Sequence, residues 1–73
     1  MREEIQVNYE LNIIGVEGEF TEEFSHVFDS SLYNSDIEGT DFMMVNFKVQ
    51  ELRNTHGDVF LLEFSVNRGG VMQ

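Results

Sequence analysis

The feature that most constrains the fold is a run of alternating apolar and polar residues near the N-terminus. Over residues 4–14, apolar side chains occupy every second position: Ile5, Val7, Tyr9, Leu11 and Ile13. Successive side chains of a strand point to opposite faces, so a period of two predicts a half-buried β-strand. Gly15 and Gly18 follow the run and end the predicted strand.

Residues 21–33 show a different spacing and predict a helix. Four apolar residues follow a helical stripe at i, i+3, i+4 and i+8: Phe24, Val27, Phe28 and Leu32. Thr21 is a residue type that caps helices, and Glu22 and Glu23 follow it in the first turn, where the helix dipole favours anions.

The second half of the chain predicts two paired strands, 42–52 and 58–67, joined by a turn at 54–57. Side chains that face each other across a hairpin must lie on the same side of the sheet. The register that meets this condition places apolar residues opposite one another and sets one charge pair on the outer face: Val45 with Val66, Phe47 with Phe64, Val49 with Leu62, and Lys48 with Glu63.

The resulting fold class is α+β, with the order β-α-β-β and one helix packed on a three-stranded sheet. A right-handed crossover makes the first two strands parallel. If the third strand lies between them, the sheet is fully antiparallel in the order 1-3-2; the alternative is a mixed sheet in the order 1-2-3. Residues 1–73 form a single domain, which at this length buries only about 60% of its unfolded surface.

Charge is distributed very unevenly along the chain. The first 41 residues hold eleven acids against Arg2, whereas residues 42–73 hold three acids and three bases. Such charge repels itself and does not stabilise a fold, so it predicts a basic partner and argues against binding to anionic membranes or nucleic acid. The predicted partner-binding residues lie in or beside the expected helix: Glu17, Glu19, Glu22, Glu23, Asp29, Asp36, Glu38 and Asp41.

The sequence offers little for catalysis or metal binding. It has no cysteine and two histidines, and it contains none of the nucleophile or nucleotide-binding motifs, so we expect neither an enzyme nor a cofactor. Residues 34–39 resemble the start of an EF-hand calcium loop, but its twelfth position is Val45 where a bidentate glutamate belongs. A polar turn is the preferred interpretation, and no metal site is predicted.

A few apolar residues have no place in the predicted core. By parity they fall on the sheet face opposite the helix: Ile14, Phe42, Met44, Val59 and Leu61. Leftover apolar surface on a small sheet commonly marks an interface, and small domains without disulfides often gain stability from a second subunit. The sequence therefore predicts a homodimer.

In size, acidity and lack of cysteine, the whole chain resembles the small inhibitors that bacteriophages make against host nucleic-acid-binding proteins. The resemblance is one of class and carries no specific motif. It implies a DNA mimic that presents carboxylates in place of phosphates in the host cytoplasm, with the histone-like nucleoid protein HU as the favoured target. The alternative is a homodimeric protein-interaction module whose charge serves only solubility. No apolar run reaches the length of a membrane span.

Overall fold

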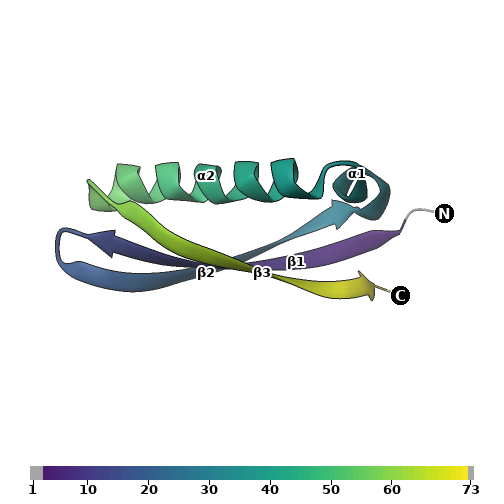
Figure 1. The fold of residues 1–73 in the computed structure, drawn as a ribbon, viewed down its shortest axis with the longest axis horizontal. Coiled ribbons are helices and arrows are strands. Elements are labelled where there is room, and N and C mark those ends of the chain that lie inside the picture. The colour runs from purple at the N-terminus through teal and green to yellow at the C-terminus, as the bar shows by residue number, and fades with distance from the viewer. Residues whose placement is uncertain (1–2, 73) are drawn as a thin grey trace.

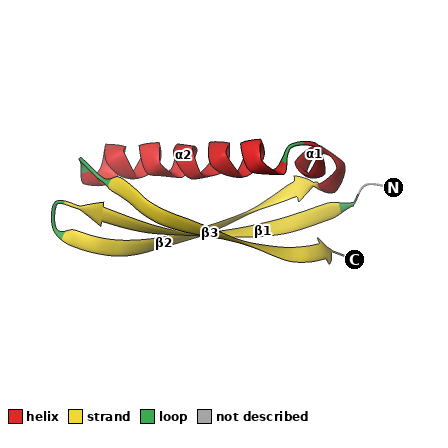
Figure 2. Cartoon of the chain, viewed as in Figure 1, coloured by secondary structure: helices red, strands yellow, loops and turns green. Residues whose placement is uncertain are grey.

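The computed structural model describes residues 3–72 and arranges them as a sheet covered on one face by helices (Figure 2). In chain order the elements are β1 (Glu4–Gly15), β2 (Gly18–Asp29), α1 (Ser30–Ser35), α2 (Ile37–His56) and β3 (Phe60–Met72). The strands form one antiparallel sheet in the order β2-β1-β3. The α+β class and the antiparallel sheet are confirmed, whereas the predicted element order β-α-β-β is wrong.

The first predicted strand, 4–14, is confirmed as β1, and it continues through a tight turn into β2. Gly15 pairs with Gly18 across this turn, and Gly18 adopts φ 123°, a backbone conformation that favours glycine. The predicted helix over 21–33 is wrong, because most of this segment is β2. Phe20, Phe24 and Phe28 are four residues apart, a spacing that suits one face of a strand as well as one side of a helix.

The predicted strand over 42–52 is also wrong, because these residues belong to α2. A spacing of about four places Asp41, Val45, Val49 and Leu52 on the buried side of this helix. Asp36 caps its N-terminus by accepting a hydrogen bond from the Gly39 amide at 3.1 Å. The predicted turn at 54–57 is instead the C-terminal end of α2, which ends at His56 and is capped by Gly57 with φ 82°.

The position of β1 changes the predicted pairing of strands. β1 lies in the middle of the sheet, where Tyr9 faces Val66 and Leu11 faces Phe64. The predicted strand order 1-3-2 and its mixed alternative 1-2-3 are therefore both wrong. Every predicted pair of the second hairpin is wrong as well, because one member of each lies on α2: Val45–Val66, Phe47–Phe64, Val49–Leu62 and Lys48–Glu63.

The last predicted strand, 58–67, is confirmed as a strand, but its parity is only partly as expected. The register of β3 against β1 shifts between Asn12 and Ile13, so that Leu61 faces Ile13 while Glu63 faces Asn12. This irregularity leaves Phe60 and Leu62 exposed, although both were expected to face the helix.

The core lies between α2 and the covered face of the sheet, and it is built mainly on β1. Among the residues whose burial the structure describes, the buried apolar side chains come from β1, α1 and α2, with Val59 from the α2–β3 connection: Ile5, Val7, Tyr9, Leu11, Ile13, Tyr33, Val45, Val49, Leu52 and Val59. The molecule is elongated, with extents of 46 × 17 × 17 Å. Figure 1 shows α2 running along the long axis, with α1 at one end and the β1–β2 turn at the other. Within residues 3–72, neither helix combines the length and hydrophobicity that crossing a bilayer requires.

Candidate interaction surfaces

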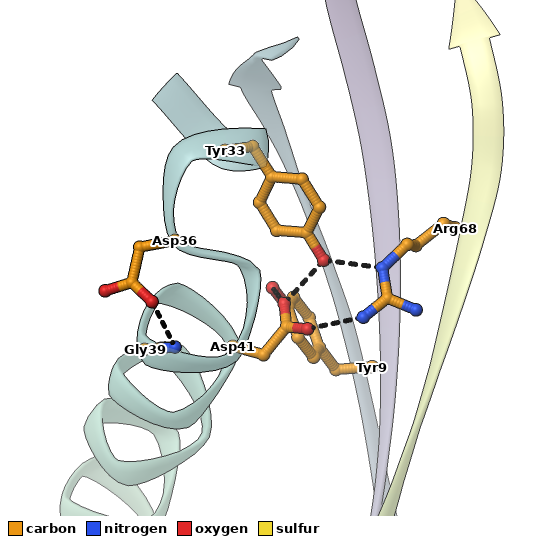
Figure 3. Close-up of polar contacts among 6 residues, drawn as sticks. All are labelled: Tyr9, Tyr33, Asp36, Gly39, Asp41 and Arg68. Atoms are coloured by element: carbon orange, nitrogen blue, oxygen red, sulfur yellow. Dashed lines mark hydrogen bonds and ion pairs between the residues drawn. The ribbon is translucent and has the colours of Figure 1, made fainter. Parts of the chain in front are cut away.

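Asp41 is the centre of a buried polar network that joins four elements (Figure 3). The hydroxyls of Tyr9 and Tyr33 donate to its Oδ1 at 2.7 and 2.8 Å. Arg68 donates from Nη2 to its Oδ2 at 2.9 Å and from Nε to the Tyr33 hydroxyl at 2.9 Å. Asp41 is only 5% exposed, so its predicted place in the acidic binding surface is wrong.

This network holds elements of the fold together. Burial raises the pKa of Tyr9 far above its usual value of 10, and the hydrogen bond to Asp41 raises it further. The pKa of Tyr33 is raised for the same two reasons, with burial the larger. Both hydroxyls therefore stay protonated and donate to a carboxylate that also holds Arg68. The network locks α1, α2 and β3 onto the central strand.

Two more of the predicted binding acids cap helices. Asp29 accepts hydrogen bonds from the Ser31 and Leu32 amides and caps α1. Asp36 caps α2. Neither carboxylate is wholly available to a partner, although Asp36 remains exposed.

Glu22 is partly neutralised from within the chain. It lies beside α2, where Lys48 approaches it at 3.6 Å and also approaches Glu51 at 3.3 Å. The Lys48 ammonium lies 5.7 Å from the centre of the Phe24 ring. Glu22 therefore belongs to the helix-covered side of the sheet and contributes little to an acidic surface.

The remaining predicted acids are exposed but do not form one band. Glu17 lies in the β1–β2 turn and Glu38 in the first turn of α2, at opposite ends of the long axis (Figure 1). Glu19 and Glu23 lie on β2. A continuous band flanking the expected helix does not exist, because that helix is a strand.

The structure gathers a different set of carboxylates on the sheet face turned away from α2. We call this surface the acidic face. Strand alternation and the pairing register place five glutamates on it: Glu4, Glu10, Glu19, Glu23 and Glu63. Within residues 3–72 it carries no lysine or arginine, because Lys48 and Arg53 lie on α2 and Arg68 turns inward.

The centre of the acidic face is a like-charge pair. Glu10 lies directly opposite Glu23 on neighbouring strands, an arrangement that destabilises a sheet by roughly 0.2–1 kcal/mol. An open depression of about 520 Å³ lies here, lined by both glutamates and by neutral polar residues that include Asn8, Ser25 and Asn67. Beside it, Asn12 accepts from Thr21 at 3.2 Å and donates to Glu63 at 2.9 Å.

Sequence reasoning missed Glu4, Glu10 and Glu63 as candidate binding residues. The signal was present for Glu10, because the alternation over 4–14 already turned it away from the core. This alternation does not group Glu10 with Glu23, because the sequence predicts Glu23 on a helix. Glu63 belongs to the charge-balanced half of the chain, from which the sequence predicts no partner-binding acid.

The predicted dimer residues are scattered. Val59 is only 1% exposed and lies in the core, so its expected place outside the core is wrong. Met44 and Leu61 are partly buried against the same core, because α2 and β3 turn them toward it. Ile14 is exposed on the outer sheet face opposite Phe60, and Phe42 is exposed on α2.

Within the described part of the chain, no group of three or more metal-ligating side chains is placed to hold an ion. Of the calcium-loop residues, Asp36 is a helix cap and Glu38 lies within α2. Comparison with known families, with characterised proteins and with solved structures gives no match to this chain.

Proposed function

We propose that this chain is an acidic DNA mimic that occupies the nucleic-acid site of a basic DNA-binding protein and inhibits it in the cytoplasm. The observation that carries the proposal is the acidic face. It presents five glutamates on an open sheet, with no lysine or arginine on that face within residues 3–72.

The geometry of this face suits a phosphate-binding partner. Carboxylates two residues apart on a strand are separated by about 6.6 Å, and strands lie about 4.8 Å apart. A sheet therefore spreads charge in two directions on the scale of a nucleic-acid backbone, whose duplex carries one charge per about 1.7 Å of axis. The Glu10–Glu23 pair costs the fold stability, which supports a role outside folding.

Competition against duplex DNA tests the proposal, with the nucleoid protein HU as the first basic target. The wild-type chain should displace labelled duplex from HU, and its affinity should fall steeply as salt rises, because charge pairs at an exposed surface are screened. Neutralising the centre of the acidic face with E10Q/E23Q/E63Q should reduce competition at least tenfold.

The matched control neutralises the same number of carboxylates outside that face, with E38Q/E51Q/D58N. This variant has the same net charge as the first and should compete nearly as well as wild type. Equal losses in the two variants would mean that net charge, and not the acidic face, drives binding. Unchanged competition by E10Q/E23Q/E63Q would contradict the mimic.

The second candidate is a homodimeric interaction module in which charge serves solubility. The observation that favours it is the exposed aromatic surface of α2, where Phe42 and Phe47 face solvent. Binding through such a surface changes little with salt, whereas binding through the acidic face changes steeply.

A further inference from the structure

The solvent side of α2 differs from the rest of this acidic molecule because its central part carries no charge. We call it the helix face. It borders an open groove of about 630 Å³, in which Glu51 is the one charged residue among the described lining residues. These are Gly39, Phe42, Met43, Asn46, Phe47, Gln50, Glu51 and Asn54. Phe42, Met43 and Phe47 are 62%, 60% and 72% exposed.

The composition of this solvent-facing side is unusual for a surface helix. The side of a helix that points away from the core usually carries charged residues. Here the apolar residues Met43 and Phe47 point to solvent while Asp41 and Lys48 point toward the sheet. Clustered exposed apolar side chains rimmed by polar groups mark an interaction site.

We propose that the helix face is a homodimer interface in which α2 packs antiparallel against α2 of a second copy. This inference does not rest on the proposed DNA mimicry. Juxtaposed like charges cost an interface several kcal/mol. Two molecules that each carry a net charge of −10 therefore need a contact surface without charge, and the middle of the helix face provides one.

The amides on this face fit a second copy of the same chain. Asn46, Gln50 and Asn54 each carry both donors and an acceptor, so that an amide near a twofold axis can pair with its own copy. With the axis beside Asn46, Met43 packs against Gln50 of the second copy, and the aromatic rings lie close to the axis.

The direction of packing follows from Glu51 and from the helix dipoles. In a parallel pair each Glu51 would face its own copy, whereas in the antiparallel pair it faces the region of Phe42. Antiparallel packing also opposes the two helix dipoles, which is the favourable arrangement. The Glu51 carboxylate already has Lys48 as a partner within its own chain.

The available area is sufficient for a dimer. A buried phenylalanine removes about 150–250 Å² from water, so Phe42 and Phe47 each still offer on the order of 100–150 Å². With Met43 and the three amides, two copies bury on the order of 1,000–1,200 Å² in total. This reaches the lower end of specific interfaces, as expected for a dimer that dissociates at low concentration.

Sedimentation equilibrium of the full chain tests the dimer. Wild type at about 100 μM should show about twice the chain mass of 8.5 kDa. Phe47→Asp should sediment as a monomer, while Phe60→Asp, which changes a ring of similar exposure on β3, should remain a dimer. Circular dichroism checks that both variants are folded. A monomeric wild type, or a dimer that survives Phe47→Asp, overturns the proposal.

Single cysteines test the direction of packing, because the chain has none of its own. In the antiparallel dimer Asn46→Cys lies near the axis and should form a disulfide-linked dimer under mild oxidation. Asn54→Cys lies about 12 Å further along the helix, too far from its own copy to cross-link. Cross-linking of both variants would indicate parallel packing. If neither variant cross-links, this interface is excluded. Failure of these tests leaves the competition experiment with HU unaffected.

Discussion

At the scale of single residues, the Asp41 network is the feature that most strongly specifies one arrangement of the helices on the sheet. Two tyrosines and one arginine from separate elements converge on one carboxylate. Each buried hydroxyl would lose its acceptor if Asp41 moved, and an unsatisfied buried polar group costs about 1–3 kcal/mol. The network therefore selects one position of α1 and α2 over the sheet.

The tyrosines of this network should titrate only as the protein unfolds. In the folded chain the pKa values of Tyr9 and Tyr33 are raised, whereas in the unfolded chain they return to about 10. The unfolded state thus loses its protons first, so this contribution to stability is complete below pH 10 and is lost as pH rises above it. Tyrosinate absorbance and circular dichroism should change together in an alkaline titration.

The variant Tyr33→Phe is compared with wild type in the same alkaline titration. It should reduce the free energy of unfolding by about 1–3 kcal/mol, because Asp41 and Arg68 both lose a partner. Tyr9 should still ionise only on unfolding. Ionisation near pH 10 of either tyrosine in wild type, or of Tyr9 in this variant, with the circular dichroism spectrum unchanged would contradict burial of that tyrosine in the network.

At the scale of elements, α2 decides how the aromatic residues of the second half are used. The helical period buries Leu52 and turns Phe47 to solvent. If the same residues formed the predicted strand, Phe47 would be buried. The two residues therefore report directly on the secondary structure of this segment.

Truncating Leu52 and Phe47 to alanine should have very different effects on the stability of the fold. Leu52→Ala removes a buried side chain and should lower the free energy of unfolding by about 2–5 kcal/mol. Phe47→Ala should change it by no more than about 0.5 kcal/mol in urea unfolding at concentrations where the chain is monomeric. A loss for Phe47→Ala as large as that for Leu52→Ala would mean that residues 42–52 are a strand after all.

The sequence was sufficient for β1 and for the existence of β3, because their alternation has no helical counterpart. It was insufficient for β2 and α2, since Phe24 and Phe28, or Val45 and Val49, are four residues apart and fit both periods. The residues that cap α2 indicate its helical structure. Asp36 with Glu38 in the following turn, and Gly57 at the far end, bound a helix of 20 residues.

The prediction of the candidate site depends on the same assignment of residues 18–29 to a helix or to a strand. The acids were recognised as unusual from charge alone, but their grouping required the correct position of β2. Glu23 faces Glu10 across two strands, whereas the predicted helix groups Glu22 with Asp29. The burial of Asp41 cannot be read from the sequence, because it depends on Tyr9 and Arg68, which lie 32 and 27 residues away along the chain.

At the scale of the whole molecule, elongation and charge act together. The net charge of −10 is spread over a body only 17 Å wide in two directions. At low salt the Debye length of about 30 Å exceeds that width, so carboxylates on all sides repel one another. Folding brings these charges closer than the unfolded chain does, and the fold is weakened by its own charge.

Salt should therefore stabilise this protein. Raising NaCl from about 10 to about 150 mM shortens the Debye length from about 30 to about 8 Å. We expect a gain on the order of 1 kcal/mol, which corresponds to about 4–8 °C in Tm for a domain of this size. In E10Q/E23Q the Tm at low salt should be higher and the rise smaller. A Tm that is constant or falls over this range would show that repulsion is negligible.

The central place of β1 also determines the order in which the chain can assemble. Its pairing with β2 closes a turn of two residues, whereas its pairing with β3 waits for two helices to be made. Hairpins form within microseconds, and contacts between distant segments form more slowly. During synthesis the β1–β2 hairpin emerges first, with its apolar side open until α2 leaves the ribosome. The final 13-residue strand then completes the sheet, and only when Arg68 arrives does Asp41 gain its counter-charge.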